Sequence, residues 1–100
     1  MPTPEVFDVD PRMLRLPPSR RGGADPAKLQ RQIARHGKST VNMPRIFVYR
    51  AADGVLVIYD GVTRATRVAK LLPGQSVTVE VIGTTNSLGS QNPTVGDKLP

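Results

Sequence analysis

The stretch from Arg45 to Leu72 places the tightest limits on the fold of this chain. Two runs rich in β-branched and aromatic residues, RIFVYR and VLVIYD, are separated by the turn AADG, which is a pattern typical of a β-hairpin. The second run ends at Asp60-Gly61, and apolar residues then recur at helical spacing from Val62 to Leu72. We therefore predict a hairpin that leads through a short turn into a helix, which ends before Pro73-Gly74.

The residues on either side of this stretch predict three more elements. One or two short strands are expected in Glu5–Leu16, and a flexible basic loop in Ser19–Gly23. A first helix begins at Asp25-Pro26, since Asp is a good N-cap and Pro is tolerated at the first helical position, and it ends at Gly37. SVTVEVI (residues 76–82) alternates between apolar and polar residues, as a half-buried strand does.

The order of these elements is strand, helix, hairpin, helix, strand, which predicts an α+β fold with a small mixed sheet and two main helices. We expect one domain over residues 1–83, because 100 residues allow no more than one modest core. Residues 84–100 are polar and rich in Gly, Ser, Asn and Pro, so we expect a flexible tail, either disordered or docked, that could serve a protein partner.

Charge is the most uneven feature of the composition. The net charge is +6, and thirteen of the fourteen Lys and Arg residues lie between Arg12 and Lys70. This favours an anionic partner such as a nucleotide or nucleic acid, although a solvated basic surface gives the same composition. The chain has only four aromatic residues, too few for a platform that stacks successive bases.

Other classes are excluded by what the sequence lacks. With no cysteine, the chain forms no disulfide, no thiolate zinc site and no thiol redox centre. The N-terminus shows no basic segment followed by an apolar run, and no apolar stretch approaches the length of a membrane span. We therefore expect a cytoplasmic protein without a membrane partner.

HGKST (residues 36–40) looks like the end of a phosphate-binding P-loop, but it fails that motif twice. The motif G-x-x-x-x-G-K-[ST] needs a glycine at position 32, where this chain has Gln32. It must also open a helix, whereas HGKST follows one. A helix C-terminus with a basic loop is the simpler interpretation, and the loop could still line a site built elsewhere.

A better anion site is predicted where the second helix begins. Its first-turn N–H groups are free, Gly61 allows close approach to the backbone, Thr63 offers a hydroxyl, and Arg64 can bind phosphate through two nitrogens. Arg67 lies on the same helix face as Arg64, at i+3. An ordinary amphipathic helix with a solvated basic face is the alternative.

The order of these motifs resembles the ParB and sulfiredoxin superfamily. Its members show P-x-R, a helix, G-x-x-x-P-I-x-V, a hairpin, and then G-E-R-R-x-x-A in ParB proteins or G-G-C-H-R in sulfiredoxins. The matching parts here span roughly Val6 to Ile82, and they are Pro18-Ser19-Arg20, Pro26–Gly37, Pro44–Val48 and Gly61–Arg64 running on to Ala65 and Ala69.

The resemblance implies a nucleotide pocket between the helix that starts at Gly61 and the basic Pro-Ser-Arg loop. It assigns phosphate contacts to Arg64 and Arg20, and it places Gly37, Lys38, Ser39 and Thr40 along the same pocket. DGVTRATRVAKL looks most like the ParB-like, nuclease-like domains of bacterial polymorphic toxins and phage-associated proteins.

Val62 marks the main departure from this pattern. It stands where sulfiredoxins carry their catalytic cysteine, so reduction of a sulfinic acid is excluded. It also replaces the glutamate of ParB proteins, a carboxylate that would help to place a metal and nucleotide. No room follows Ile82 for a helix-turn-helix domain, which argues against sequence-specific binding as a partition protein.

Two functions of different classes remain. The first is an enzyme that handles phosphate, a nuclease or nucleotide hydrolase, with Asp60 and His36 as the candidate catalytic residues and a nucleotide with magnesium as a conceivable cofactor. Asp60 could equally be a turn residue, and His36 a capping group at the end of a helix. The second is a non-catalytic module that binds DNA or a nucleotide, or a protein partner.

Overall fold

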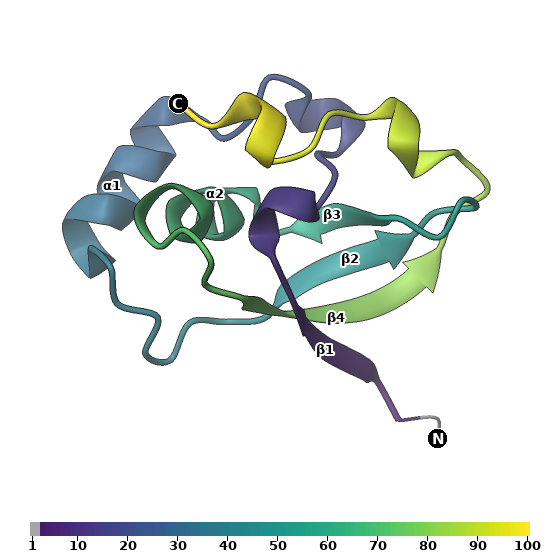
Figure 1. Cartoon of the computed structure of the whole chain (residues 1–100), viewed down its shortest axis with the longest axis horizontal. Coiled ribbons are helices and arrows are strands. Elements are labelled where there is room, and N and C mark those ends of the chain that lie inside the picture. The colour runs from purple at the N-terminus through teal and green to yellow at the C-terminus, as the bar shows by residue number, and fades with distance from the viewer. Residues whose placement is uncertain (1–2) are drawn as a thin grey trace.

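A computed structural model shows an α+β fold in which two helices lie on one side of a mixed sheet, as predicted (Figure 1). The model describes residues 3–100, so Met1 and Pro2 of the predicted domain lie outside the described part. The strands are β1 (Glu5–Val9), β2 (Ile46–Arg50), β3 (Leu56–Asp60) and β4 (Val77–Thr84), in the order β1-β4-β2-β3. β4 pairs antiparallel with β1 and parallel with β2, and β2 and β3 form the predicted hairpin.

The two helices begin where the sequence places them but are capped differently. In α1 (Pro26–His36), the Asp25 carboxylate accepts a hydrogen bond from the Lys28 N–H at 3.1 Å, and Gly37 ends the helix with φ +55°. In α2 (Val62–Leu71), Gly61 occupies the N-cap position and no side chain caps the first turn. Neither helix in residues 3–100 is long and apolar enough to cross a bilayer.

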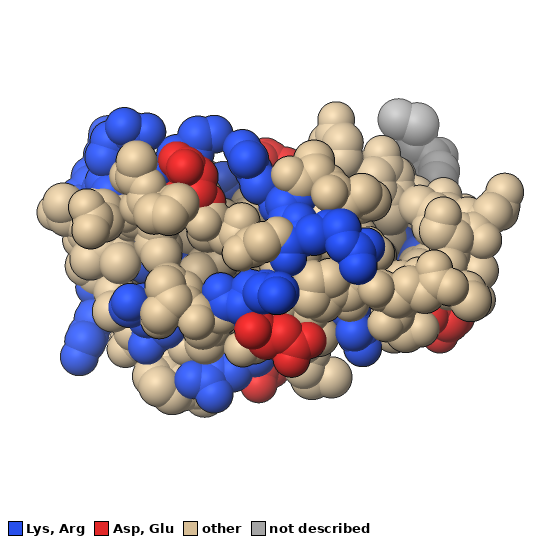
Figure 2. Space-filling view, turned by 90° about the horizontal axis from the view of Figure 1, so that it is seen from above, with Lys and Arg blue, Asp and Glu red and all other residues tan. Residues whose placement is uncertain are grey.

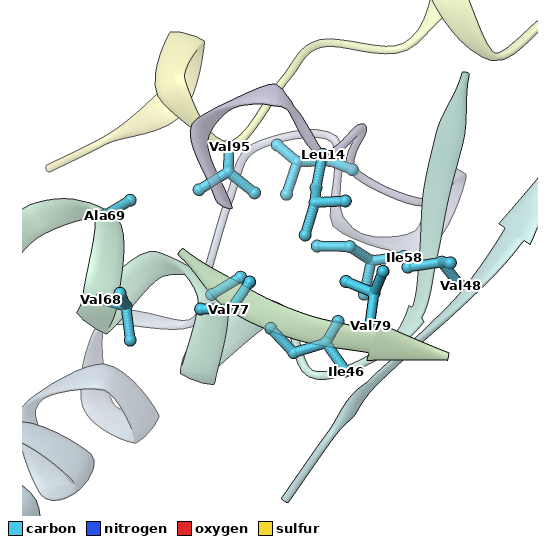
Figure 3. Close-up of a cluster of buried hydrophobic side chains, with 11 residues drawn as sticks. Leu14, Ile46, Val48, Ile58, Val68, Ala69, Val77, Val79 and Val95 are labelled. Carbon is cyan, nitrogen blue, oxygen red and sulfur yellow. The ribbon is translucent and has the colours of Figure 1, made fainter. Parts of the chain in front are cut away.

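The core lies between the sheet and α2, and two segments outside the sheet close it (Figure 3). Ile46 and Val79 from neighbouring strands are fully buried, as is Val68 of α2. Leu14 and Val95, each 1% exposed, cover the other side of this cluster. The helices and the sheet alone would therefore leave the core open to water.

The segment expected to continue the first strand is different in the structure. Residues Pro11–Met13 form a short 3-10 turn, because the Asp10 carboxylate accepts the Arg12 N–H and so caps that turn. Arg15 then makes only isolated bridges, to Val57 of β3 and to Thr94. The basic loop also contains a 3-10 turn, Pro18–Arg20.

Residues 84–100, the C-terminal segment, are docked on the fold, which is the second of the two alternatives that the sequence left open. Leu16 donates its N–H to the Pro93 carbonyl and Val95 donates to the Leu14 carbonyl, both at 2.8 Å. The Arg15 guanidinium binds the Asn92 carbonyl, also at 2.8 Å. A polar segment of this kind is held mainly through its backbone groups, which its composition does not reveal.

Asp53, in the turn between β2 and β3, holds the start of this segment in place. Its carboxylate accepts the N–H groups of Gly89 and Ser90 at 3.1 and 3.0 Å. Hydrogen bonding from Ser90, side chain first and then backbone, together with Gly89, lowers the pKa of Asp53 to about 2.

This pKa predicts how stability responds to acid. Asp53 has a lower pKa in the folded chain than in the unfolded chain, where it is about 3.9. Its contribution to stability is therefore complete above about pH 4 and is lost as the pH falls towards 2. We expect an NMR titration of the Asp53 carboxyl to have its midpoint near 2, and Asp53→Asn to flatten the dependence of unfolding free energy on pH in that window. A midpoint near 4 would contradict the docking contact.

Candidate phosphate-binding site

Arg20 and Arg64, distant in the sequence, line one cleft of about 260 Å³ that we call the Arg20 cleft. It lies where the turn at Pro18–Arg20 meets the end of β3 and the start of α2. The two arginines that were predicted to bind phosphate are therefore brought together. Its lining residues are Pro17, Ser19, Arg20, Lys28, Gln32, Tyr59, Asp60, Gly61, Val62, Thr63 and Arg64.

The Arg64 guanidinium is held in a defined position at this cleft. Its Nη2 donates to the Arg45 carbonyl at 3.0 Å and lies 3.7 Å from Oδ2 of Asp60. The side chain is only 17% exposed, and its Nε is buried without a hydrogen-bond partner among residues 3–100. Arg64 thus has donor capacity left over after these contacts, since a guanidinium has five N–H groups.

A glycine is required at position 61 both by the conformation of the turn and by the position of the Arg64 guanidinium. The φ of Gly61, +120°, is one that residues with a side chain rarely adopt. A Cβ at this position would come within 3.0 Å of Cγ1 of Ile46 and 3.1 Å of Nη2 of Arg64. Any side chain here would therefore push against the core or displace the Arg64 guanidinium.

The free end of α2 opens into the same cleft. The first hydrogen bond of the helix runs from the Ala65 N–H to the Gly61 carbonyl, at 2.9 Å. The N–H groups of the three residues between them have no capping side chain. Because Gly61, Val62 and Thr63 all line the cleft, its wall carries the partial positive charge of a helix N-terminus.

Two further clefts adjoin the Arg20 cleft along α1, and Gln32 lines all three. The Arg31 cleft, of about 310 Å³, shares Lys28 and Thr63 with the Arg20 cleft. The Met43 cleft, of about 260 Å³, shares Arg64 with it. The Oε1 atom of Gln32 is buried and has no hydrogen-bond partner within residues 3–100.

Ten of the fourteen basic residues form two groups. The side chains of one group are engaged within the fold, through backbone carbonyls, Asn92 or the carboxylates of Glu5 and Glu80; this group comprises Arg12, Arg15, Arg21, Arg45, Arg50 and Lys70. The side chains of the other group form no hydrogen bond or ion pair with the described residues and line the clefts along α1; this group comprises Arg20, Lys28, Arg31 and Arg35. In the view of Figure 2, Lys and Arg gather mainly over the half of the surface that carries α1.

HGKST contributes less to the site than expected. Ser39 lines the Met43 cleft together with Arg64, and its hydroxyl accepts the Val41 N–H at 3.3 Å. Gly37, Lys38 and Thr40 are not among the lining residues of these three clefts. Only Ser39 of these four is therefore placed beside Arg64.

Arg67 lines the Met43 cleft together with Arg64, on the same side of α2 as expected, but its side chain is buried inside the fold. It is 2% exposed, and its Nη1 donates to the carbonyls of Gly37 and Ser39, both at 2.8 Å. Its Nη2 lies 3.5 Å from Sδ of Met43, and its burial lowers the pKa of the guanidinium. Arg67 lines the Met43 cleft, but its main role is to hold the loop after α1.

The two candidate catalytic residues line different clefts. Asp60 lies in the Arg20 cleft with its side chain 63% exposed, next to Arg64. His36 is exposed and lines the Arg31 and Met43 clefts. None of these three clefts has both residues in its wall.

Sequence reasoning missed several contributors to these clefts, among them Lys28, Gln32 and Tyr59. Lys28 and Gln32 are one helical turn apart, at i and i+4, which places them on the same face of α1. That spacing was visible in the sequence. The approach of this face to the start of α2 was not, because it depends on packing between elements.

Comparisons with known proteins assign no family or function to this chain. The sequence matches no protein-family model, and no curated protein matches it.

The role of Arg67 predicts a large effect on stability. We expect Arg67→Met to lower the free energy of unfolding in urea by about 2–4 kcal/mol, because the carbonyls of Gly37 and Ser39 lose the charged donor that is buried against them. Arg35→Met is the control, since Arg35 is exposed and its loss should change stability by about 0.5 kcal/mol or less. Equal effects of the two substitutions would show that the Arg67 contacts do not hold the loop.

Proposed function

We propose that this chain is a non-catalytic module that binds the phosphate of a nucleotide or nucleic acid in the Arg20 cleft. The observation that carries the proposal is the convergence of Arg20, Arg64 and the uncapped start of α2 on one cleft. Arg64 and Arg20 can each offer two parallel N–H groups to phosphate oxygens. Thr63 adds a hydroxyl, and the first turn of α2 adds backbone donors.

The basic residues along α1 favour a polyanion or a nucleotide over a simple ion. Lys28, Arg31 and Arg35 continue the positive surface away from the Arg20 cleft, and none is engaged elsewhere among residues 3–100. A row of this kind can follow further phosphates. The row therefore supports a ligand that carries more than one charged group. We propose that the protein meets this ligand in the cytoplasm.

The resemblance to the ParB and sulfiredoxin superfamily points the same way, and membership of it is part of the proposal. The two arginines to which the resemblance assigns phosphate, Arg20 and Arg64, line the same cleft. The bridge between Arg15 and Val57 also places the chain just before the P-x-R turn beside β3, the strand that leads into α2. These features support the nucleotide pocket that the resemblance implies.

If magnesium takes part in binding, we propose that it is bound together with the ligand. Asp60 is the one carboxylate that lines the Arg20 cleft, and among residues 3–100 no three His, Asp or Glu side chains gather as a metal site. Mg²⁺ commonly binds through one or two carboxylates together with substrate phosphates. Asp60 could supply a single ligand of that kind.

The first test measures binding of a fluorescent single-stranded DNA by anisotropy as a function of salt. We expect Arg64→Ala to weaken binding by about 10- to 100-fold, because a charge-assisted hydrogen bond to phosphate is lost. The slope of log affinity against log salt should fall by about one. Arg50→Ala is the matched control, since Arg50 has the same charge but pairs with Glu5. If both variants lost the same amount of affinity, the loss would reflect net charge alone, and the proposal would be wrong.

The second test asks whether the module is catalytic. We expect no hydrolysis of nucleotides or DNA with or without Mg²⁺, because His36 and Asp60 line separate clefts. His36→Ala and Asp60→Ala should leave hydrolysis at the background level. Cleavage by the unaltered chain that disappears in both variants would overturn the non-catalytic assignment and restore the nuclease or hydrolase hypothesis.

A further inference from the structure

A second cavity, of about 490 Å³, adjoins the Arg20 cleft, and we call it the tyrosine pocket. Pro17, Ser19 and Tyr59 line both cavities, so the two lie side by side. Its volume falls in the range typical of sites for small organic molecules, about 300–1,000 Å³. The position and size both fit a ligand that carries a phosphate at one end and an organic group at the other.

The two tyrosines of the chain meet in this pocket. Tyr49 and Tyr59 lie edge to face, with ring centroids 5.4 Å apart and an interplanar angle of 74°. Tyr59 is 61% exposed, and Tyr49 is partly buried beneath it. The packing orients the Tyr59 ring and leaves room on its surface for one flat aromatic group.

The C-terminal segment builds the opposite wall. Leu88, 49% exposed, adds an apolar surface, and Ser87 and Gln91 add polar side chains that can bond the edge of a ring. This wall packs closely on the hairpin, because the backbone of Gly89 leaves no room for a Cβ beside Cγ2 of Val55. The pocket therefore combines an aromatic ring, apolar sides and a few hydrogen-bonding groups.

We propose that the tyrosine pocket receives the base of a nucleotide whose phosphate lies in the Arg20 cleft. The inference rests on the proposed function and adds to it the chemical class of the ligand: a nucleobase linked to phosphate. A flat base fits the exposed ring of Tyr59, and its edge fits Ser87 and Gln91. The adjacent cationic cleft favours a phosphorylated base over a proline-rich peptide, which aromatic grooves also accept.

The fluorescence of the two tyrosines can be used to measure binding in this pocket. The chain has no tryptophan and only two tyrosines, both in the pocket, so its intrinsic fluorescence reports on this site. AMP and ribose 5-phosphate form the test pair, because they share the sugar phosphate and differ in the base. We expect AMP to quench the fluorescence and to bind about 5- to 100-fold more tightly than ribose 5-phosphate in calorimetry. N-acetyltyrosinamide at the same AMP concentration corrects for light absorbed by the base.

Three variants distinguish the contribution of the base contact from that of the phosphate contact. Tyr59→Leu keeps apolar bulk without the ring, so the ratio of AMP to ribose 5-phosphate affinity should fall to near one. Tyr59→Phe keeps the ring and should keep the ratio. Arg64→Ala should weaken both ligands by a similar factor and leave the ratio unchanged. Circular dichroism of each variant checks that the fold is retained.

The outcomes separate this inference from the proposed function. Equal affinity of the unaltered chain for AMP and ribose 5-phosphate, with both weakened by Arg64→Ala, would overturn the base pocket and leave the phosphate site standing. No binding of either ligand or of single-stranded DNA would overturn both. A proline-rich peptide that quenches the tyrosines where AMP does not would assign the pocket to a peptide and also overturn the inference.

The source of the base is decided by a second pair of ligands. We expect a single-stranded oligonucleotide to bind more tightly than its abasic counterpart, and Tyr59→Leu to remove the difference. If the oligonucleotide also binds more tightly than AMP, the base belongs to a strand that follows the basic row on α1. If AMP binds as well or better, the base belongs to a free nucleotide. An oligonucleotide and an abasic strand that bind equally, with AMP no better than ribose 5-phosphate, would contradict the inference.

Discussion

The buried guanidinium of Arg67 is the contact on which the candidate site depends. It extends from α2 to the carbonyls of Gly37 and Ser39, just beyond the end of α1. One charged side chain therefore joins the two helices at the point where the chain leaves α1 for β2. Burial of a charge is costly, and here two carbonyls and the Met43 sulfur replace part of the lost water. This contact ties the end of α1 to α2, beside the Met43 cleft.

The same chemistry, an arginine bound to backbone carbonyls, recurs in the docking of the C-terminal segment. Arg15 and Arg21 reach the segment around Asn92, and Arg12 reaches the Ala69 carbonyl of α2. About half of the positive charge thus serves the fold itself. Net charge alone overstates the surface available to an anion, and the residues that remain along α1 are the ones that matter for binding.

The sequence predicted the parts of the fold that depend on local chemistry. The hairpin, the Asp25 cap, the end of α1 at Gly37 and the start of α2 at Gly61 follow from turn and capping preferences within a few residues. It also predicted that Arg20 and Arg64 would share a cleft, though through family resemblance and not through residue patterns.

What the sequence could not predict is how distant segments meet. Arg67 looks like part of an exposed basic face until α1 is placed beside it, because helical spacing describes one helix and not its neighbours. The docking of residues 84–100 is hidden for a related reason. Backbone groups make the contacts, and every residue type carries them, so a polar composition resembles that of a disordered tail.

The docked segment makes stability and binding inseparable in this small chain. The backbone groups around Pro93 and Val95 close the core, while Ser87, Leu88 and Gln91, a few residues earlier, form a wall of the tyrosine pocket. A change that releases the segment would expose Leu14 and Leu16 and remove that wall together. The phosphate cleft would be affected as well, because Leu16 and Arg21, on either side of the Pro18–Arg20 turn, are both hydrogen-bonded to this segment. Loss of the segment should therefore remove a wall of the base pocket directly and weaken the phosphate contacts through Arg20, while the contacts of Arg64 depend on the two helices.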